Sequence, residues 1–228
     1  MDGDSPAAVS GPTVIPFHGP ADYRRHAPRV AAHLREGGLL AYPTETVYGL
    51  GCALRSEALA RLARIKRQGR ARPFLLLVRT PRDAPGLEWT EHGRRLAQEF
   101  WPGPLTLVLR TAPGRYPAEV TGEQGTVAIR ASPHPAVQAL LDALGEPITS
   151  TSANRPDEPP AMTADEVRAV IEALAPGEPF WILDGGPLPP SPPSTVLDVS
   201  GRRPRLLRAG ALPLEDLKRV VGEIDERG

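Results

Sequence analysis

Residues 39–51 read LLAYPTETVYGLG, an apolar run that becomes polar at Thr44 and closes on Gly49 and Gly51. The run 39–42 is typical of a buried strand. In α/β proteins, ligands bind beyond the carboxyl ends of such strands, where the hydroxyls and the carboxylate of 44–46 stand. Glycine lets the backbone approach a ligand closely. The stretch therefore predicts an α/β fold with a polar site beside this strand, although hydroxyls that only cap a turn are the competing interpretation.

Helices and strands alternate outward from this stretch in both directions. Apolar periodicity and capping residues predict helices over 21–35, 56–66, 90–100, 135–144, 163–174 and 214–224. Short apolar runs predict strands over 39–42, 74–78, 105–110, 126–130, 147–149, 180–183, 195–199 and 205–208. Because several strand pairs lack a helix between them, the expected class is α/β with a mixed sheet.

The composition is that of a folded chain with one core. Of the 228 residues, 40% are hydrophobic and 24% are charged, close to the average for globular proteins. The first residues are small, polar and rich in glycine and proline, so we expect 1–13 to be a flexible arm and 14–228 to be a single domain. The proline-rich stretch 185–193 is interpreted as a loop, because too few apolar segments follow it for a second core.

The sequence favours a cytoplasmic protein without a membrane span. Its apolar runs are far shorter than the roughly 20 residues that cross a bilayer, and its beginning has neither the basic nor the apolar part of a secretory signal. Cys52 is the one cysteine, so no internal disulfide is expected, and we interpret it as a small buried residue. One cysteine and five histidines provide no zinc-type cluster, so no structural metal is expected.

Positive charge is concentrated in one region, although the totals of 27 basic and 27 acidic residues balance. Eight cations and no acid lie in 61–82. Cations at a helix end can simply complement the helix dipole, but eight exceed that need and indicate a polyanion, of which phosphate is the commonest. Lys66 stands out within this run, since Lys218 is the only other lysine.

Two further features point to a site for an anion. The polar segment 150–154, STSAN, follows a predicted strand as 44–46 does. Arg130 and Arg208 each stand at the end of a predicted apolar strand. Each is therefore either paired structurally or directed at an anionic ligand. The chain has no P-loop, no HExxH zinc motif and no GxSxG nucleophile elbow, which disfavours the usual kinase and hydrolase classes.

Seven segments, in order and at compatible spacing, together resemble the YrdC family, the threonylcarbamoyl-AMP synthases. They are Tyr42–Gly51, Lys66–Phe74, Trp101–Thr106, Val127–Arg130, Ser152–Asn154, Pro193–Val196 and Leu207–Gly210. The resemblance covers about residues 16 to 215, nearly the whole chain. It implies a single YrdC-like domain, a twisted mixed sheet with flanking helices round a basic concave cavity.

The resemblance also implies a reaction. Members use ATP, L-threonine and bicarbonate to make L-threonylcarbamoyladenylate and pyrophosphate, and Mg²⁺ accompanies the ATP. The product supplies the group that a separate tRNA threonylcarbamoyl transferase complex places on the adenosine next to the anticodon. Such a reaction needs no protein nucleophile, because the carbamate of threonine attacks the α-phosphate, and the protein positions anions and neutralises charge.

Carried over position by position, the resemblance assigns roles to residues of this chain. Thr44, Arg130 and Ser194 are expected to bind the threonine, with Ser150 as a further contact. The nucleotide and its phosphates are expected to contact Lys66, Arg70, Ser152, Asn154 and Arg208. Lys66 and Arg130 are the expected catalytic residues, and no residue is expected to ligate a metal.

The chain departs from the family pattern at two positions, which leaves two other functions open. Gln68 stands where members commonly have arginine, with Arg67 or Arg70 as substitutes for the charge, and Leu77 stands where many have histidine. A YrdC-like paralogue would bind nucleotide or RNA without threonine-dependent synthesis. An RNA-binding module that uses 61–82 is the other alternative, but it predicts aromatic residues among the cations, and only Phe74 is there.

Overall fold

The computed structural model describes residues 11–66 and 73–226. Arg67, Gln68, Arg70 and most of the predicted arm lie outside the described residues. The strands form one sheet in the order β1-β10-β2-β3-β9-β4-β8-β6-β11-β12, with β5 beside β6 and β7 beside β8. Both parallel and antiparallel pairs occur, so the predicted mixed α/β class is confirmed.

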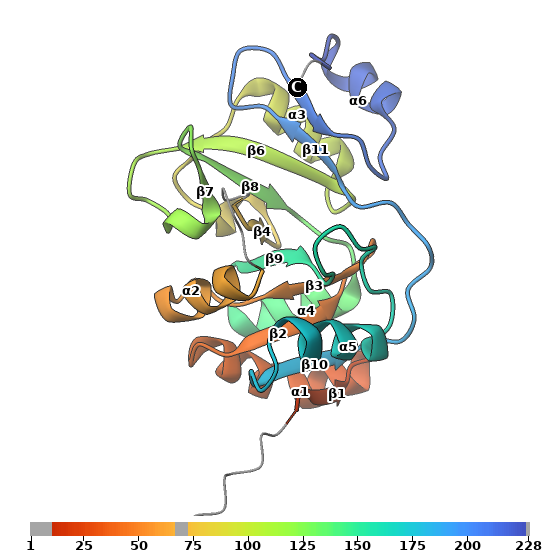
Figure 1. The fold of residues 1–228 in the computed structure, drawn as a ribbon. Coiled ribbons are helices and arrows are strands. Elements are labelled where there is room, and N and C mark those ends of the chain that lie inside the picture. Colours follow the sequence, from red (N-terminus) through yellow and green to blue (C-terminus); the bar gives the residue numbers. More distant parts are fainter. Residues whose placement is uncertain (1–10, 67–72, 227–228) are drawn as a thin grey trace, which may run out of the picture.

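The sheet has two halves that meet at β9. The lower half in Figure 1 contains β1 (Thr13–Pro16), β10 (Phe180–Asp184), β2 (Leu39–Pro43) and β3 (Tyr48–Gly51). The upper half contains β8 (Thr126–Arg130), β6 (Leu105–Thr111), β11 (Thr195–Asp198) and β12 (Arg205–Arg208), with the short β5 (Leu87–Glu88) and β7 (Thr121–Gly122). Between them, β9 (Ile148–Ser152) pairs antiparallel with β3 and with β4 (Leu75–Leu77).

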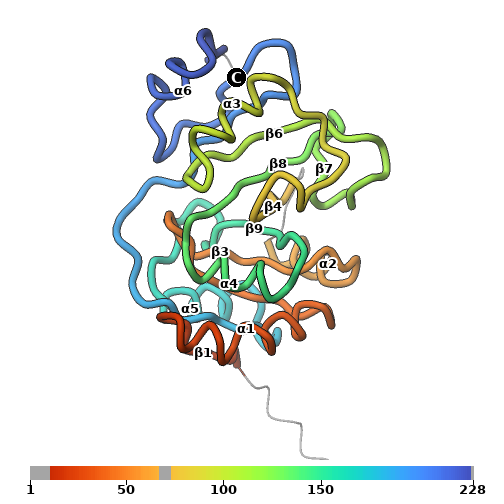
Figure 2. The backbone as a smooth tube through the Cα atoms, turned by 180° about the vertical axis from the view of Figure 1, so that it is seen from behind, coloured from red at the N-terminus to blue at the C-terminus, as the bar shows by residue number. Residues whose placement is uncertain are grey.

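Helices cover the lower half on both faces. In Figure 1, α2 (Ser56–Ile65) and α5 (Ala164–Leu174) lie in front of β2 and β10. On the other side, which Figure 2 shows from behind, α1 (Pro20–Arg35) and α4 (Pro135–Leu144) pack against each other. Tyr42, Leu77 and Ile148 join these two helices in one buried cluster, while Leu50 and Leu76 face the opposite cluster, to which α2 contributes.

The upper half carries its helices on one face. Here α3 (Glu91–Phe100) packs on β6 and on α6 (Leu214–Val221), with the single-turn helices η1 (Pro81–Asp83) and η2 (Ala118–Val120) in the loops. A Cβ on Gly93 of α3 would lie 3.4 Å from Leu109 Cδ2, so the odd-numbered residues of β6 face α3. The even-numbered residues of β6 face away from this helix. None of the helices in the described residues is long and apolar enough to cross a membrane.

Two stretches expected to be loops are strands. Residues 48–51 form β3, and β9 runs on to Ser152 rather than ending at 149. The glycines of β3 permit a close approach of the neighbouring strand, β9. A Cβ on Gly51 would overlap the carbonyl oxygen of Thr149, and a Cβ on Gly49 would lie 2.9 Å from Ser150 Oγ.

Candidate functional site

Strand register places three of the expected site residues on one face of the sheet. Residues paired across neighbouring strands share a face, as do alternate residues along a strand. Ser150 pairs with Leu75, and Leu77 pairs with Arg130, so Ser150, Ser152 and Arg130 lie on the same face. On β6, the pairing of Leu107 with Ile129 puts Thr106 opposite Arg130.

Ser194 joins the same face through Thr106. The two hydroxyls lie 2.9 Å apart, and both side chains are buried. Since α3 covers the odd-numbered residues of β6, this polar face of the upper half lies away from that helix. We call it the Arg130 face, defined by Ser150, Ser152, Arg130, Thr106 and Ser194.

The loop between β2 and β3 is held by the Thr44 hydroxyl. Its Oγ1 donates to the carbonyl oxygen of Val47 at 2.7 Å and accepts hydrogen bonds from the main-chain N–H groups of Thr46 and Val47, each at 3.2 Å. Thr44 is buried, and its own N–H also bonds to the Val47 oxygen. The hydroxyl therefore caps the turn and fixes the shape of the loop. The expected contact of Thr44 with threonine stays a prediction.

Arg130 is the most deeply buried charge on the face, with 4% of its side chain exposed. Its Nη1 lies 3.1 Å from Glu45 Oε1, an ion pair without hydrogen-bond alignment, and donates to Thr46 Oγ1 at 3.3 Å. Within the described residues, Arg130 Nε and Glu45 Oε1 are buried without a hydrogen-bond partner. A buried guanidinium N–H with no acceptor is costly unless something else supplies one.

The sequence did not indicate that Glu45 pairs with Arg130, or that Ser132 and His134 extend this network. Glu45 also accepts a short hydrogen bond from Ser132 Oγ, and Ser132 Oγ in turn accepts from the N–H of His134 at 3.2 Å. Burial lowers the pKa of His134, against the opposing effect of Glu45. Glu45 lies within the polar stretch and Ser132 lies two residues after Arg130, but no sequence pattern indicated that they meet across 87 positions.

Lys66 reaches the far end of β9. Its Nζ donates to the main-chain oxygens of Ser152 and Asn154 at 2.9 and 2.8 Å, and to Asn154 Oδ1 at 3.1 Å. Ser152 Oγ donates to the same Oδ1 at 2.7 Å, so three of the five expected nucleotide contacts form one cluster. No carboxylate pairs with this ammonium in the parts of the chain that the structure describes, and burial lowers its pKa to about 8.

Arg208 and Ser194 form a third cluster. The guanidinium of Arg208 donates from Nε and Nη2 to the main-chain oxygen of Ser194 at 3.2 and 2.8 Å, and from Nη2 to Ser194 Oγ at 3.2 Å. The following turn packs closely, because a Cβ on Gly210 would lie 2.5 Å from the Ser194 carbonyl carbon. Arg208, expected at the nucleotide, therefore also shapes the segment that carries Ser194.

Two of the described cations in 61–82 are paired with acidic residues. Arg61 forms a close ion pair with Glu178, and Arg79 pairs with Asp142 at 2.7 Å. Only Lys66 of its described members lies among the expected site residues; Arg70 falls outside the described residues. Leu77, where the family commonly has histidine, is fully buried and paired with Arg130 and Ile148.

Carboxylates for a resident metal are not clustered. Within residues 11–66 and 73–226, no group of three or more His, Cys, Asp or Glu side chains is arranged to hold a metal ion. Mg²⁺ held by one or two carboxylates relies on substrate phosphates for further ligands. The described residues therefore do not form a site that would hold Mg²⁺ without the phosphates of a substrate.

Comparison with known proteins gives the same family as the motifs. The Sua5/YciO/YrdC family model, described as "Telomere recombination", matches residues 32–210. The chain is 38% identical over 200 residues to the threonylcarbamoyl-AMP synthase of Pyrococcus abyssi, covering 86% of this chain and 57% of that protein. It is 41% identical over 180 residues to the threonylcarbamoyl-AMP synthase of Chromohalobacter salexigens, covering 77% of this chain and 92% of that protein.

Solved structures of the same family have a similar fold. The crystal structure of P. abyssi Sua5 complexed with L-threonine superposes with a TM-score of 0.83 at 35% identity, covering 93% of this chain and 62% of that one. E. coli YciO gives a TM-score of 0.77 at 27% identity, covering 91% and 99%. The chain thus spans less than two thirds of the P. abyssi proteins but nearly all of YciO and of the C. salexigens protein. The resemblance read from the seven motifs is confirmed, and the chain belongs to the Sua5/YciO/YrdC family.

Proposed function

We propose that this chain is a threonylcarbamoyl-AMP synthase, which makes L-threonylcarbamoyladenylate from ATP, L-threonine and bicarbonate and releases pyrophosphate. Family membership supports this reaction, as do relatives of that name at 38 and 41% identity. The observation that carries the proposal is the buried Arg130, whose Nε lacks an acceptor within the described residues on a face lined with hydroxyls.

Threonine fits the chemistry of the Arg130 face. A carboxylate is the natural acceptor for a guanidinium N–H that has none, and the bond between two charged groups is stronger than a neutral one. We assign the threonine carboxylate to Arg130 and its hydroxyl to Ser150 and Ser194, with the Thr44 loop closing the pocket. Glu45 Oε1, buried without a hydrogen-bond donor, would accept one from the substrate.

ATP is assigned to the cluster at the end of β9. The partly buried ammonium of Lys66 bonds only to neutral oxygens within the described residues, so its charge is not neutralised and can attract a phosphate. We place the phosphates on Lys66, the adenosine moiety near Ser152 and Asn154, and a further charge contact on Arg208. Arg70 stays assigned to the phosphates by its place in the sequence alone. Mg²⁺ would enter on the phosphate oxygens of ATP.

The chemistry then needs positioning rather than a protein nucleophile. The threonine amine adds to bicarbonate and water leaves, which gives a carbamate. A carbamate oxygen attacks the α-phosphorus, the bond from that phosphorus to the bridging oxygen breaks, and pyrophosphate leaves with the electron pair. Lys66 stabilises the negative charge that grows on the leaving group, and Arg130 holds the threonine in line. The product would pass to a tRNA threonylcarbamoyl transferase complex.

The test is pyrophosphate release from ATP, Mg²⁺ and bicarbonate, with and without L-threonine. Release should require threonine and should fall at least a hundredfold in Lys66→Ala. Lys218→Ala is the matched control, because the only other lysine is exposed and bonded to Glu226 at 2.8 Å. Release that does not depend on threonine would refute the synthase and favour the paralogue that binds nucleotide or RNA.

A further inference from the structure

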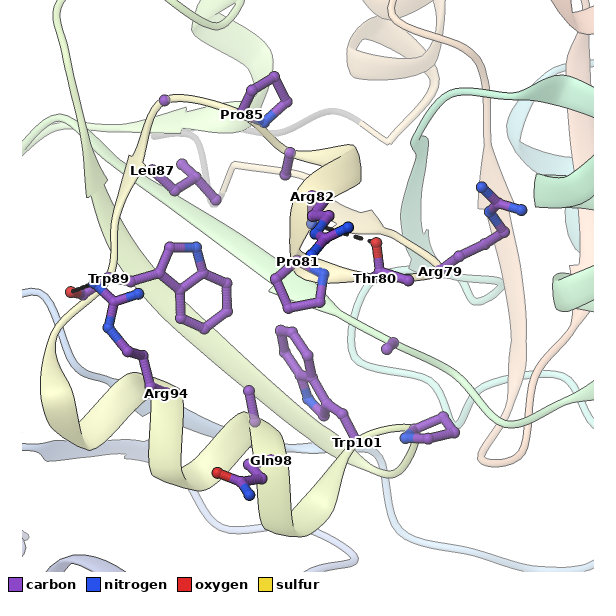
Figure 3. A pocket seen from close by; sticks show the side chains of 15 residues that line it. Arg79, Thr80, Pro81, Arg82, Pro85, Leu87, Trp89, Arg94, Gln98 and Trp101 are labelled. Atoms are coloured by element: carbon purple, nitrogen blue, oxygen red, sulfur yellow. Dashed lines mark hydrogen bonds between the residues drawn. The ribbon is translucent and has the colours of Figure 1, made fainter.

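A cavity lies on the opposite face of the sheet from Arg130. Its volume is about 680 Å³, within the range of small-molecule sites. It opens between η1, the β5 segment and α3, on the face of β6 that α3 covers (Figure 3). The side chains that matter for its chemistry are Arg82, Trp89, Arg94, Gln98 and Trp101. None of these was assigned to the synthase reaction.

Two indole rings shape the cavity. Trp89 and Trp101 meet edge to face, with centroids 5.9 Å apart and planes at 87°. Trp101 is anchored by Nε1, which donates to the main-chain oxygen of Leu105 at 2.7 Å. Both rings are half-buried, so part of each indole remains open to the cavity. Fixed, partly open indoles are good surfaces for a flat aromatic ligand.

The charge around the cavity has one sign. Arg79, Arg82 and Arg94 line it, and no acidic residue does. Arg79 is already paired with Asp142 and points away from the cavity (Figure 3). Arg94 uses Nη2 to donate to the Trp89 carbonyl oxygen at 3.1 Å, and neither it nor Arg82 has a carboxylate partner in the described residues. A guanidinium has five N–H donors, so both arginines keep donors for an anion.

We propose that this cavity binds a nucleotide, with its base against Trp89 and Trp101 and its phosphate on Arg82 and Arg94. An aromatic surface next to uncompensated guanidinium groups matches a base next to a phosphate, and Gln98 can bond to the edge of the base. The site is separate from the Arg130 face and does not depend on the synthase reaction. Its ligand is a free nucleotide or a nucleotide within single-stranded RNA.

Intrinsic fluorescence reports on this site directly. Two of the three tryptophans line the cavity, whereas Trp181 stacks on His33 with centroids 4.1 Å apart. The experiment titrates the full chain with AMP and with an octaadenylate RNA. The chain carries Trp181→Phe, which removes the third tryptophan, and Lys66→Ala, which disables the phosphate cluster at β9. We expect saturable quenching that is at least tenfold weaker when Arg82→Ala and Arg94→Ala are added. Arg95→Ala, an exposed neighbour on α3 outside the cavity, is the matched control and should change the affinity less than twofold.

The outcomes separate the ligand sources. Quenching by both probes assigns free nucleotides, and quenching by RNA alone assigns nucleotides within RNA. No quenching by either probe, or equal affinity with and without the two arginines, would overturn the proposal. Threonine-dependent pyrophosphate release, measured in Arg82→Ala/Arg94→Ala with Lys66 intact, should be unchanged, so failure here and failure of the synthase proposal are distinct results.

Discussion

The ammonium of Lys66 lies 2.8 Å from the main-chain oxygen of Asn154, and its other main-chain acceptor, Ser152, belongs to the same short segment. These acceptors are dipoles rather than charges. They satisfy the hydrogen bonds of Lys66 without neutralising it, while burial lowers its pKa to about 8. The cluster is therefore a positive site whose charge depends on pH near the physiological range.

The first prediction concerns that dependence. Above its pKa, Lys66 loses the proton that attracts phosphate, so the affinity for ATP should fall by about tenfold between pH 7.5 and 9. Lys66→Arg should retain its affinity over this range, because a guanidinium stays protonated. Calorimetric titration of ATP into the wild-type chain and into Lys66→Arg at several pH values measures the two affinities. An affinity of the wild-type chain that does not change with pH would contradict the assigned phosphate contact.

The same pKa predicts the direction of a stability change. The folded chain holds the Lys66 proton less tightly than the unfolded chain does, so unfolding takes up a proton between about pH 8 and the ordinary lysine pKa near 10.4. The unfolded state binds more protons there, and the contribution of Lys66 to the free energy of unfolding therefore rises with pH. The difference between wild type and Lys66→Met in urea unfolding at pH 7.5 and 10 isolates this contribution. A difference that stays constant or moves the other way would show that the pKa is not lowered.

The second prediction concerns the pair Glu45 and Arg130. Because only 17% of the Glu45 side chain and 4% of the Arg130 side chain are exposed, removing one partner leaves a charge in a poorly solvated place. Arg130→Ala and Glu45→Ala should each lower the free energy of unfolding by about 3 kcal/mol. The double variant should lose at least about 1 kcal/mol less than the sum, since the residues interact directly.

An ion pair at the surface serves as the control for this comparison of single and double variants. Arg55 and Glu146 form a well-aligned ion pair, but 38 and 30% of their side chains are exposed. Its coupling energy should stay below about 1 kcal/mol, as for exposed pairs in general. Additive effects for Glu45 and Arg130 in urea unfolding would show that the two do not depend on each other.

The third prediction concerns Cys52. The thiol is fully buried, it lies 3.5 Å from Thr149 Oγ1, and burial raises its pKa to about 11. The thiolate is the reactive form, so iodoacetamide at pH 8 should leave the folded chain unmodified. Mass spectrometry across a urea series should show alkylation that follows global unfolding. Rapid alkylation in the absence of urea would mean that this part of the core opens locally.

The sequence was informative where the contacts are local. The apolar run 39–42 and the helix ending at Arg35 match β2 and α1 within one residue, because periodicity and a following glycine pair act over a few positions. The glycines at 49 and 51 stand out in the sequence, but the sequence does not show that a neighbouring strand packs closely against them. They lie against β9, about 100 positions away, and no local pattern reveals which strand will pair there.

The same limit applies to the candidate site. Arg130 was recognised as either paired or aimed at an anion, and the structure gives it a partner, Glu45, while leaving Nε without one in the described residues. The alternatives could not be separated in the sequence because the partner is 85 positions away. Two members of the run of cations, Arg61 and Arg79, form ion pairs that the sequence did not indicate, since Glu178 and Asp142 lie far from the run along the chain.

The last prediction concerns Gly210, which follows Arg208 into a turn packed against Pro193 and Ser194. A Cβ there would overlap the Pro193 carbonyl oxygen, which also accepts a hydrogen bond from the Ala211 N–H at 2.9 Å. Gly210→Ala must push these two backbones apart, at a cost of about 1–3 kcal/mol in the free energy of unfolding. Gly201→Ala is the control, because its nearest neighbouring atom would be 3.9 Å away. Since the displaced segment carries Ser194, Gly210→Ala should also raise the KM for threonine more than that for ATP. Equal stability of the two alanine variants in urea unfolding would mean that this turn has room to move and does not fix Ser194 on the Arg130 face.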